Sequence, residues 1–452
     1  MGSLWFLGLY LLLVSVSSST AHVFQEKDSF ELSIYHVKTN DSSLNPKSHF
    51  EDIVSNDNER LKTLYYMLSQ NNTNTMTSSS FSTYSHNPKD LKSVSVTLNS
   101  GMSIGSGNYY VKVGLGSPPK YYSMIIDTGS SFSWLQCQPC TIYCHNQVEP
   151  VFDPKASKTY RHLSCRSPEC SSLKQATLND PFCDAGSNCL YTTSYGDGSF
   201  SIGYLSQDRL TITPTQILPS FVYGCGQDNQ GLFGRAAGIL GLARNKLSLI
   251  NQVSAKYGYA FSYCLPSFEG GQGGVLSIGT TAVSSPAFKY TPMVASAKIP
   301  SLYFLKLTAI TVGMKPLGVA ATSYRVLCII DSGTVITRLP TPLYTALSKA
   351  FAAIVSTKFA KAPAISILDT CFKGSPSAVS AAVPQIQLLF QGGAGLKLGP
   401  KNSILEAEKG VSCLAFAQSN DYVIIGNRQQ QTYKVAYDVA KSRIGFAPGG
   451  CR

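Results

Sequence analysis

The chain has 452 residues, of which 14% are charged, and it carries 13 cysteines and a formal net charge of +12. Its length suffices for two or three domains, and its content of Gly, Ser, Thr, Tyr and Val favours many short strands and turns over long helices. Beyond the N-terminal leader no apolar run approaches the length of a membrane-spanning helix, which excludes an ordinary transmembrane protein.

Residues 1–21 have the pattern of a signal peptide. The apolar run from Leu4 to Val14 is too short to span a membrane comfortably, and small residues follow it as far as Ala21. We therefore expect the protein to enter the secretory pathway.

Residues 22–104 are largely polar and predict a prosegment followed by a linker. The stretch Glu59–Leu68 has the apolar spacing of a helix, whereas Asn71–Ser80 has low complexity and predicts an exposed, cleavable linker. Positions 1–85 carry a net charge of −3, and positions 86–452, the basic body, carry +15. The acidic N-terminal positions are therefore a candidate partner for the basic body. A plain disordered arm would have a similar composition. The glycosylation sequons are at Asn40 and Asn71.

A short motif occurs twice in the chain. Ile125–Ser130 reads Ile-Ile-Asp-Thr-Gly-Ser, and Ile329–Thr334 reads Ile-Ile-Asp-Ser-Gly-Thr. A carboxylate at the end of an apolar strand is costly to keep charged without partners, and two that meet can share one proton because like charges repel. Such a pair can polarise a water molecule, so Asp127 and Asp331 are the candidate acid and base of one site.

The two Asp motifs belong to a duplicated plan. In each half an apolar pair followed by glycine comes later, within Gly238–Leu242 and Val423–Asn427. The interval from the Asp motif to the apolar-Gly motif is longer in the first half than in the second. A cysteine-rich insert at 137–189 explains the excess. We therefore expect an N-terminal lobe of residues 105–292 and a C-terminal lobe of residues 293–452.

The cysteines predict disulfide bonds, because seven of the 13 fall within the insert and the chain is expected to meet an oxidising compartment. Zinc is the alternative, since Cys137, Cys140 and Cys144 are followed by His145. Because the number of cysteines is odd, at least one cysteine has no disulfide partner within the chain. Cys328 fits best because it lies in an apolar strand, where cysteine acts as a small core residue.

Over residues 107–452 the chain resembles the pepsin-like aspartic proteases. The matching motifs are Asp127–Ser131 with Trp134, Tyr195–Ser199, Gly238–Leu242, Asp331–Thr334 and Ile424–Asn427. The features similar to the atypical plant branch, which includes nepenthesins and chloroplast-nucleoid DNA-binding proteases, are the insert, Phe221–Gly226, Phe261–Leu265, Val335–Pro340, Leu368–Phe372 and Gly450–Cys451. The resemblance implies an all-β, bilobal fold with two related β-rich lobes, an active-site cleft between them and a few short helices.

The resemblance also implies an aspartic endopeptidase in which Asp127 and Asp331 activate water without a cofactor or metal ion. The supporting residues would be Thr128, Gly129, Ser130, Ser332, Gly333 and Thr334. A flap of Tyr195, Gly196 and Asp197, with Tyr195 bonded to Trp134, would close over the substrate. The implied disulfides are Cys137–Cys140, Cys144–Cys225, Cys165–Cys189, Cys170–Cys183, Cys264–Cys451 and Cys371–Cys413.

The expected partners are protein or peptide substrates and the protein's own prosegment. We expect a monomer that is made as a zymogen and is active in acid. The expected location is the extracellular space (apoplast) or the vacuole. The chloroplast is less favoured, because the leader lacks the Arg- and Ser-rich amphipathic character of a transit peptide.

Three other interpretations compete. Gly101–Gly105 matches the G-x-S-x-G pattern of serine hydrolases, but it lies in a Gly/Ser tract, and beyond it only His145 and His162 remain. A non-catalytic inhibitor or binding protein on the same scaffold would commonly have a damaged Asp motif, whereas both motifs are intact. The basic body could also bind DNA or anionic wall polymers, although its positive charges are scattered singly.

Asp197 generates a prediction about specificity. It would place a negative charge at the mouth of the expected pocket, where a basic substrate side chain could be accommodated beside bulky apolar ones. We expect Asp197→Thr to lower the preference for Lys and Arg at the cleavage site in a peptide-library digest. An unchanged preference would contradict this role.

Overall fold

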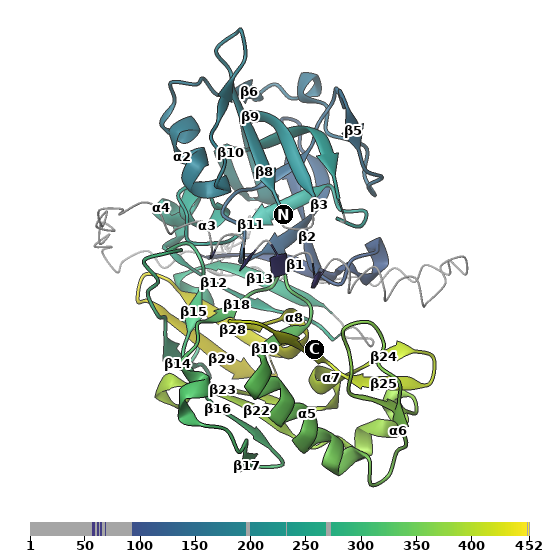
Figure 1. Ribbon diagram of the computed structural model, residues 1–452. Coiled ribbons are helices and arrows are strands. Elements are labelled where there is room, and N and C mark those ends of the chain that lie inside the picture. Colours follow the sequence, from purple (N-terminus) through teal and green to yellow (C-terminus); the bar gives the residue numbers. More distant parts are fainter. Residues whose placement is uncertain are drawn as a thin grey trace, which may run out of the picture.

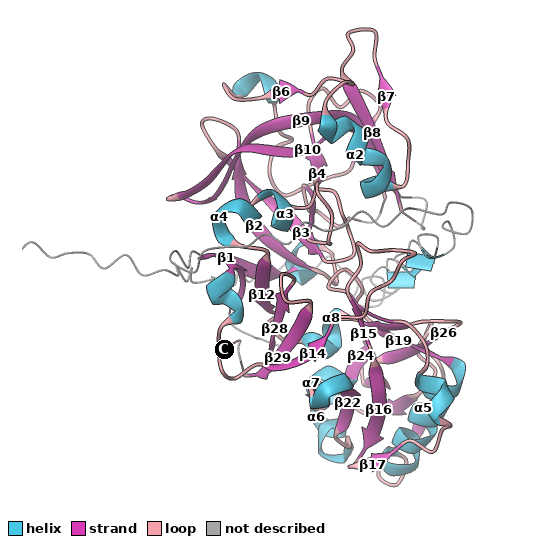
Figure 2. Ribbon diagram, turned by 90° about the vertical axis from the view of Figure 1, so that its left-hand side faces the viewer, coloured by secondary structure: helices cyan, strands magenta, loops and turns pink. Residues whose placement is uncertain are grey.

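In the computed structural model the chain forms two strand-rich bodies joined by a sheet to which both contribute (Figure 1). The structure describes residues 57–58, 61–62, 64–65, 68, 93–195, 199–231, 233–267, 273–449 and 451. The expected signal peptide, the sequons at Asn40 and Asn71, and the flap residues Gly196 and Asp197 lie outside the described residues. Strands dominate both bodies and helices are few, which confirms the predicted all-β, bilobal fold (Figure 2).

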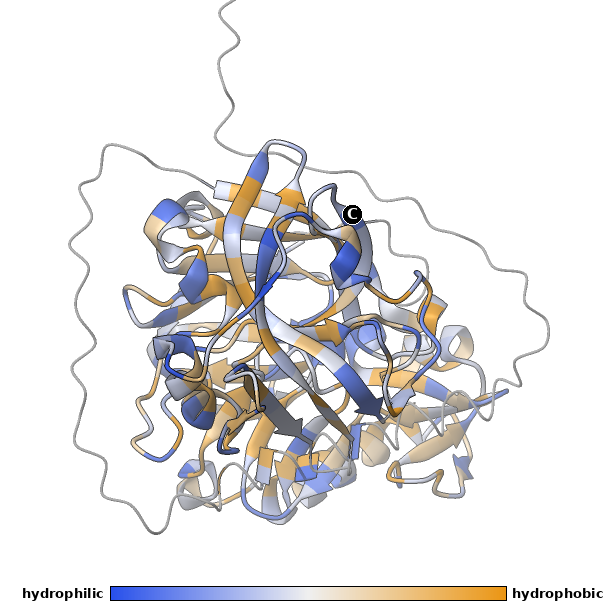
Figure 3. Cartoon of the chain, turned by 90° about the horizontal axis from the view of Figure 1, so that it is seen from above, coloured by the Kyte–Doolittle hydropathy of each residue, from blue (hydrophilic) through white to orange (hydrophobic). Residues whose placement is uncertain are grey.

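The N-terminal body is built on neighbouring strands of one large sheet, in the order β2-β3-β11-β4-β10-β9-β8-β7. Two short strands, β5 and β6, pair with β10 and β9. Buried and less buried residues largely alternate along β9, as expected for a strand with one face on the core, and Figure 3 shows the corresponding change of hydropathy along the strands. The bounds are β2 Tyr109–Leu115, β3 Lys120–Asp127, β4 Trp134–Gln136, β5 Tyr143–Cys144, β6 Arg161–His162, β7 Phe182–Cys183, β8 Cys189–Ser194, β9 Phe200–Thr213, β10 Gln216–Gln230 and β11 Gly238–Gly241.

The same sheet continues between the two bodies with strands from distant parts of the chain, in the order β14-β29-β28-β12-β13-β1. β12 lies between β13 and β28, so the halves of the chain are hydrogen-bonded to each other here. The bounds are β1 Ser93–Ser100, β12 Ala260–Cys264, β13 Gly274–Gly279, β14 Lys289–Pro292, β28 Tyr433–Asp438 and β29 Arg443–Pro448. We call these six strands the shared sheet.

The C-terminal body contains three smaller sheets, ordered β15-β18-β27-β19-β26, β17-β16-β22-β23 and β20-β21-β25-β24. The bounds are β15 Phe304–Leu305, β16 Leu307–Val312, β17 Lys315–Pro316, β18 Cys328–Ile330, β19 Thr337–Pro340, β20 Lys361–Ala362, β21 Cys371–Lys373, β22 Ile386–Phe390, β23 Gly395–Leu398, β24 Ile404–Glu408, β25 Val411–Leu414, β26 Phe416–Ser419 and β27 Val423–Ile425.

The strand arrangement around the first Asp is repeated around the second. β3 pairs in parallel with β11, which pairs antiparallel with β4; likewise, β18 pairs in parallel with β27, which pairs antiparallel with β19. Trp134 lies opposite Ile239 and Arg338 lies opposite Ile424, and each follows the Asp of its turn at the same spacing. Trp134 and Arg338 therefore occupy equivalent positions in the two bodies.

Helices play a minor part. The longest, α5, buries Leu343, Leu347, Phe351 and Val355, whose regular spacing places them on one face. No helix in the described ranges is long and apolar enough to cross a membrane. The bounds are α2 Pro168–Thr177, α3 Leu249–Gln252, α4 Ser254–Tyr257, α5 Thr341–Val355, α6 Pro376–Val379, α7 Pro400–Ser403 and α8 Asn427–Gln430.

The N-terminal strand β1 lies within the region assigned from the sequence to prosegment and linker. It pairs with β13 on one side and β2 on the other, and it buries Val94, Val96 and Leu98. In this structure the residues from Ser93 to Ser100 are therefore part of the folded body.

Two of the implied disulfides in the insert, Cys137–Cys140 and Cys144–Cys225, are wrong. The structure joins Cys137 to Cys225 and Cys140 to Cys144. Cys137 lies just beyond the end of β4, where its N–H donates to the carbonyl of Gly226 at 2.7 Å and its Cα is 5.3 Å from that of Cys225.

Cys165–Cys189 and Cys170–Cys183 are also wrong, since the structure joins Cys165 to Cys183 and Cys170 to Cys189. Cys183 and Cys189 lie opposite each other in the β7–β8 pair, but Cys183 is exposed and Cys189 is buried. Helix α2 packs on β8 and carries Cys170 into the core, where it meets Cys189.

The two implied disulfides outside the insert, Cys264–Cys451 and Cys371–Cys413, are formed. Cys328 is a buried free cysteine, and burial raises the pKa of its thiol. The three cysteines of the zinc alternative are all in disulfides, and the described part of the chain contains no group of three or more residues suited to hold a metal ion.

The disulfide pattern predicts the result of a peptide map. In a non-reducing digest analysed by mass spectrometry, we expect linked peptides that contain Cys137 with Cys225 and Cys170 with Cys189. The Cys371–Cys413 peptide serves as the internal control. Recovery of Cys144 linked to Cys225 would contradict the pairing of β5 with β10, in which Cys144 lies opposite Asn229.

Candidate active site

The two aspartates occupy equivalent places at the ends of strands. Asp127 is the last residue of β3, and Asp331 directly follows β18. Both are buried, with exposed fractions of 2% and 0%. Each strand is apolar and hydrogen-bonded on both sides, so the backbone that carries each carboxylate is fixed before the turn begins.

The first turn satisfies the carboxylate of Asp127 with its own residues. The backbone N–H of Gly129 donates to Oδ1 at 2.9 Å, and the hydroxyl of Ser130 donates to Oδ2. A carboxylate that accepts such bonds can be buried at a lower cost, because the donors replace part of the lost hydration.

The second turn repeats this arrangement around Asp331. The backbone N–H of Gly333 lies 3.3 Å from Oδ1, and the hydroxyl of Thr334 donates to Oδ2 at 2.7 Å. The predicted roles of the glycines and of the second hydroxyl residues are therefore matched in geometry by both turns.

The two turns are also bonded to each other. The N–H of Thr128 donates to Oγ of Ser332 at 3.1 Å, and the N–H of Ser332 donates to Oγ1 of Thr128 at 2.9 Å. The Thr128 hydroxyl then donates to Oδ1 of Asp331 at 3.3 Å, and the Ser332 hydroxyl to the carbonyl of Ile126 at 3.2 Å. We call these four bonds the crossed hydrogen bonds; they bring together residues that are far apart in the sequence.

Two glycines allow the neighbouring strands to pass close to the turns. A Cβ atom at Gly241 would lie 2.7 Å from the carbonyl oxygen of Ser130, and one at Gly426 would lie 2.6 Å from that of Val335. Both contacts are with backbone, so a side chain at either position would displace the turn. This explains the glycine in each of the two apolar-Gly motifs.

Buried polar residues support the second turn from the shared sheet. Gln430 donates through Nε2 to the carbonyl oxygens of Asp331 and Ile425, at 3.2 and 2.9 Å, and accepts a bond from the hydroxyl of Tyr263. Tyr263 also lies 2.7 Å from the hydroxyl of Tyr437. Burial raises the pKa of both tyrosines, so they stay neutral donors at any pH at which the protein is expected to work.

Asn427 was predicted only as part of a motif, but it links the two halves. Its side-chain amide donates to the carbonyl of Ser332 at 3.1 Å and to the Asn108 side chain at 3.1 Å. No local pattern indicated this role or the Gln430–Tyr263–Tyr437 network, because these contacts join positions that are distant in the sequence.

The predicted flap contact is present. Nε1 of Trp134 donates to the hydroxyl of Tyr195 at 2.8 Å. Tyr195 lies at the end of the β8–β9 hairpin, where its N–H donates to the carbonyl of Ser199, and its ring contacts Phe233 edge-on. The hairpin is thereby held beside the first turn, which β4 follows.

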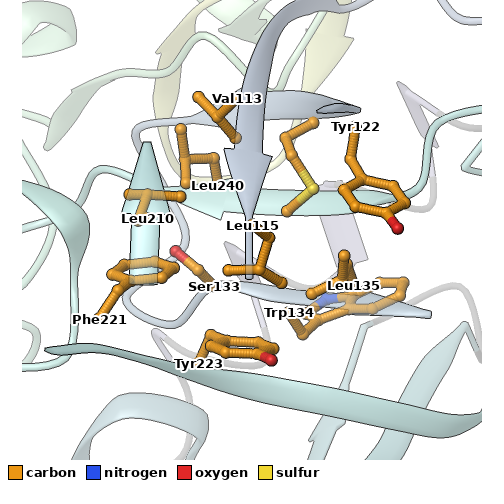
Figure 4. Close-up of a pocket in the computed structure, with 11 residues that line it drawn as sticks. Val113, Leu115, Tyr122, Ser133, Trp134, Leu135, Leu210, Phe221, Tyr223 and Leu240 are labelled. Atoms are coloured by element: carbon orange, nitrogen blue, oxygen red, sulfur yellow. The ribbon is translucent and has the colours of Figure 1, made fainter. Parts of the chain in front are cut away.

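A pocket in the N-terminal body is not part of this site (Figure 4). It is a gap of about 10 Å³ among apolar side chains that include Val113, Leu115, Tyr223 and Leu240. Neither aspartate lines it. A space of this size in an apolar core is a packing defect that barely admits one water molecule.

Comparisons with known proteins support one family. Sequence-family profiles described as xylanase inhibitor N-terminal and xylanase inhibitor C-terminal match residues 109–280 and 302–448. An aspartyl protease family protein of Arabidopsis thaliana is 44% identical over 366 residues, which cover 80% of this chain and 76% of that protein. Nepenthesin-2, an aspartic proteinase of Nepenthes gracilis, is 34% identical over 377 residues, covering 80% and 83%.

Solved structures share the fold at lower identity. Conglutin gamma, a basic 7S globulin from lupine seeds, aligns with a TM-score of 0.63 and 20% identity, covering 79% of this chain and 95% of that one. This likeness supports the fold alone.

The crossed hydrogen bonds predict a stability effect. Thr128→Val and Ser332→Ala each remove buried bonds between the turns, so we expect each to lower the free energy of unfolding by about 1–3 kcal/mol. Thr128→Val removes the bonds from the Ser332 N–H and to Asp331, whereas Ser332→Ala removes those from the Thr128 N–H and to Ile126. The double variant should lose less than the sum, because either change alone already loosens the contact between the turns on which the other bonds depend. Additive shifts in thermal unfolding would contradict this coupling between the two turns. Ser348→Ala, which removes a hydroxyl contact with Thr370 away from the site, is the control.

Proposed function

Because the chain belongs to the plant pepsin-like aspartic protease family, we propose that it is an aspartic endopeptidase that hydrolyses peptide bonds in proteins. The observation that carries the proposal is the interlocked pair of turns, in which Asp127 and Asp331 are both buried and both intact. The same turns would be poor choices for a purely structural role, because burying two carboxylates costs stability, and such groups cluster at functional sites.

In the proposed mechanism one carboxylate of the pair is ionised and the other is protonated. The ionised group takes a proton from a water molecule as the water attacks the carbonyl carbon of the scissile bond. The protonated group donates to the carbonyl oxygen, on which negative charge develops. Ser130 and Thr334 hold one oxygen of each carboxylate, so the carboxyl planes keep their orientation while the proton moves. Because the two carboxylates would share one proton, their pKa values would describe the pair and not either residue alone.

Tyr195 and Trp134 would contribute by positioning the hairpin over the substrate. Their hydrogen bond fixes one side of the hairpin tip, and the rings of Trp134 and Phe233 pack edge to face with centroids 4.9 Å apart. A hairpin held in this way can exclude bulk water from the scissile bond when substrate is present.

The proposal includes a precursor that is activated by removal of the N-terminal segment and is active in acid. Support comes from the acidic character of positions 1–85, with a net charge of −3 against +15 for the remainder of the chain. Since β1 is part of the shared sheet, the activating cut would fall before Ser93. We further propose that the enzyme is secreted to the apoplast or delivered to the vacuole, where its six disulfides would persist.

A second candidate function is a catalytically silent binding protein. The family profiles that match the chain carry the description xylanase inhibitor. In this alternative the chain would bind another protein and would not cleave a peptide substrate. Intact Asp-Thr-Gly and Asp-Ser-Gly turns favour catalysis. DNA binding could accompany proteolysis, and its affinity would then fall steeply with salt.

The test is cleavage of a denatured protein at pH 3–6, with and without pepstatin, by the matured wild type and by Asp127→Asn. We expect pepstatin-sensitive cleavage that falls at least about 1000-fold in the variant, because one carboxylate cannot supply both acid and base. The matched control is Asp153→Asn, which changes a carboxylate that caps a short helical turn outside the site. No cleavage by a folded, matured wild type would favour the binding role.

A further inference from the structure

A residue of the N-terminal segment is buried next to the second catalytic turn. The carboxylate of Asp57 accepts bonds from the backbone N–H groups of Val335 and Ile336, the latter at 3.2 Å. Nη2 of Arg338 donates to Oδ2 of Asp57 at 2.7 Å and to the side chain of Asn58 at 2.8 Å. The exposed fractions of the Asp57 and Arg338 side chains are 0% and 2%.

The contact is extended by apolar residues of the same segment. Leu61, Leu64 and Leu68 share a core cluster with residues of the C-terminal body, and Tyr65 contacts the ring of Tyr422 at 5.5 Å between centroids. The residues that complete this cluster are Ile299, Leu302, Phe304, Ile329 and Ile424. The segment is thus docked on β15, β18 and β27, the strands that hold Asp331 in place.

The donors that surround the Asp57 carboxylate form a site in their own right. A guanidinium and two successive backbone N–H groups converge on one carboxylate, and all three donors belong to residues 335–338. We call Val335, Ile336 and Arg338 the carboxylate site. Its ligand comes from a distant chain segment that lies before the predicted cleavable linker.

The position of Arg338 is equivalent to that of the residue that holds the expected flap beside the first turn. Arg338 is the equivalent of Trp134, since each follows its Asp at the same spacing and faces the same central strand of its body. Trp134 uses its polar atom to hold the hairpin that lies beside the first turn. By the same geometry the guanidinium of Arg338 faces the corresponding region beside the second turn.

Removal of the segment would take away the carboxylate partner of Arg338. The Nε of Arg338 already has no hydrogen-bond partner among the described residues, and its Nη2 bonds are both to the segment. The guanidinium and the two backbone N–H groups would remain as converging donors, and arginine is suited to bind a carboxylate with planar geometry. The site therefore favours a new carboxylate once Asp57 has gone.

We propose that in the matured enzyme the carboxylate site binds a carboxylate of the substrate, and that Asp57 occupies this site in the precursor. The inference rests on the proposed endopeptidase function, and it adds a preference for an acidic group at one substrate position. The ligand is either an Asp or Glu side chain within the substrate or the free carboxylate at its C-terminus.

The first experiment measures specificity. A recognition sequence for an unrelated protease, placed in Asn71–Ser80, allows the N-terminal segment to be cut off and removed from the full-length precursor without relying on its own activity. Matched peptides then carry Glu or Gln at each position on either side of the scissile bond. We expect Glu to raise kcat/KM by about 10- to 100-fold at one position in the wild type, as for a hydrogen-bonded charge pair.

Two variants assign this preference. Arg338→Gln should abolish the Glu/Gln ratio, whereas Arg325→Gln, which removes one positive charge shortly before β18, should leave it intact. A ratio near one in the wild type, or a ratio that survives in Arg338→Gln, would overturn the proposal. A Gln-only peptide with a free C-terminus, compared with its C-terminal amide, identifies which of the two carboxylate sources is bound.

The second experiment needs no catalysis, so it separates failure of this site from failure of the proposed function. The probe is a fluorescent synthetic peptide that spans positions 51–70, tested with its Asp57→Asn form by anisotropy on the cut Asp127→Asn protein. We expect the Asn form to bind about 10- to 100-fold more weakly, and the difference to vanish when Arg338→Gln is added. Equal binding of the two peptides would refute the site even if Arg338→Gln does not fold.

Discussion

The crossed hydrogen bonds hold the two Asp turns together, and two of these four bonds join Thr128 directly to Ser332. They align the turns from opposite bodies, so the position of each Asp depends on the other half of the chain. The shared sheet prevents the bodies from separating, and Gln430 connects that sheet to the turn at Asp331. The duplicated strands are the framework for these few bonds.

The turns themselves could be predicted from the sequence because their hydrogen bonds are local. Gly129 and Ser130 reach Asp127 from the next positions of the same turn, and the equivalent residues do the same at Asp331. The division into two related halves followed from the repeated plan for a similar reason, since each half carries its own strand and turn signals, whereas the all-β, bilobal fold was implied by the family resemblance. The bond between Trp134 and Tyr195 came from the family resemblance and is present in the structure.

Contacts that depend on the register between two strands, or on which face of a strand is buried, could not be predicted from the sequence. The pairing of Cys170 with Cys189 depends on which side of β8 the helix α2 covers, and spacing in the sequence does not specify that. The partner of Arg338 lies in a distant segment that was predicted only as a polar prosegment with a helix. The sequence duplication did contain one signal of this contact. The charged residue Arg338 occupies the position in the second half that corresponds to Trp134 in the first.

The order of strands in the shared sheet also bears on how the protein is made. β12 ends at Cys264 and its partner β28 begins at Tyr433, so nearly all of the C-terminal body must be synthesised before that edge of β12 can pair. At about 5–20 residues per second this takes roughly 10–30 seconds, while the strands of the N-terminal body are already complete. Until then the nascent chain presents an open strand edge at β12, where pairing with another chain would compete with folding.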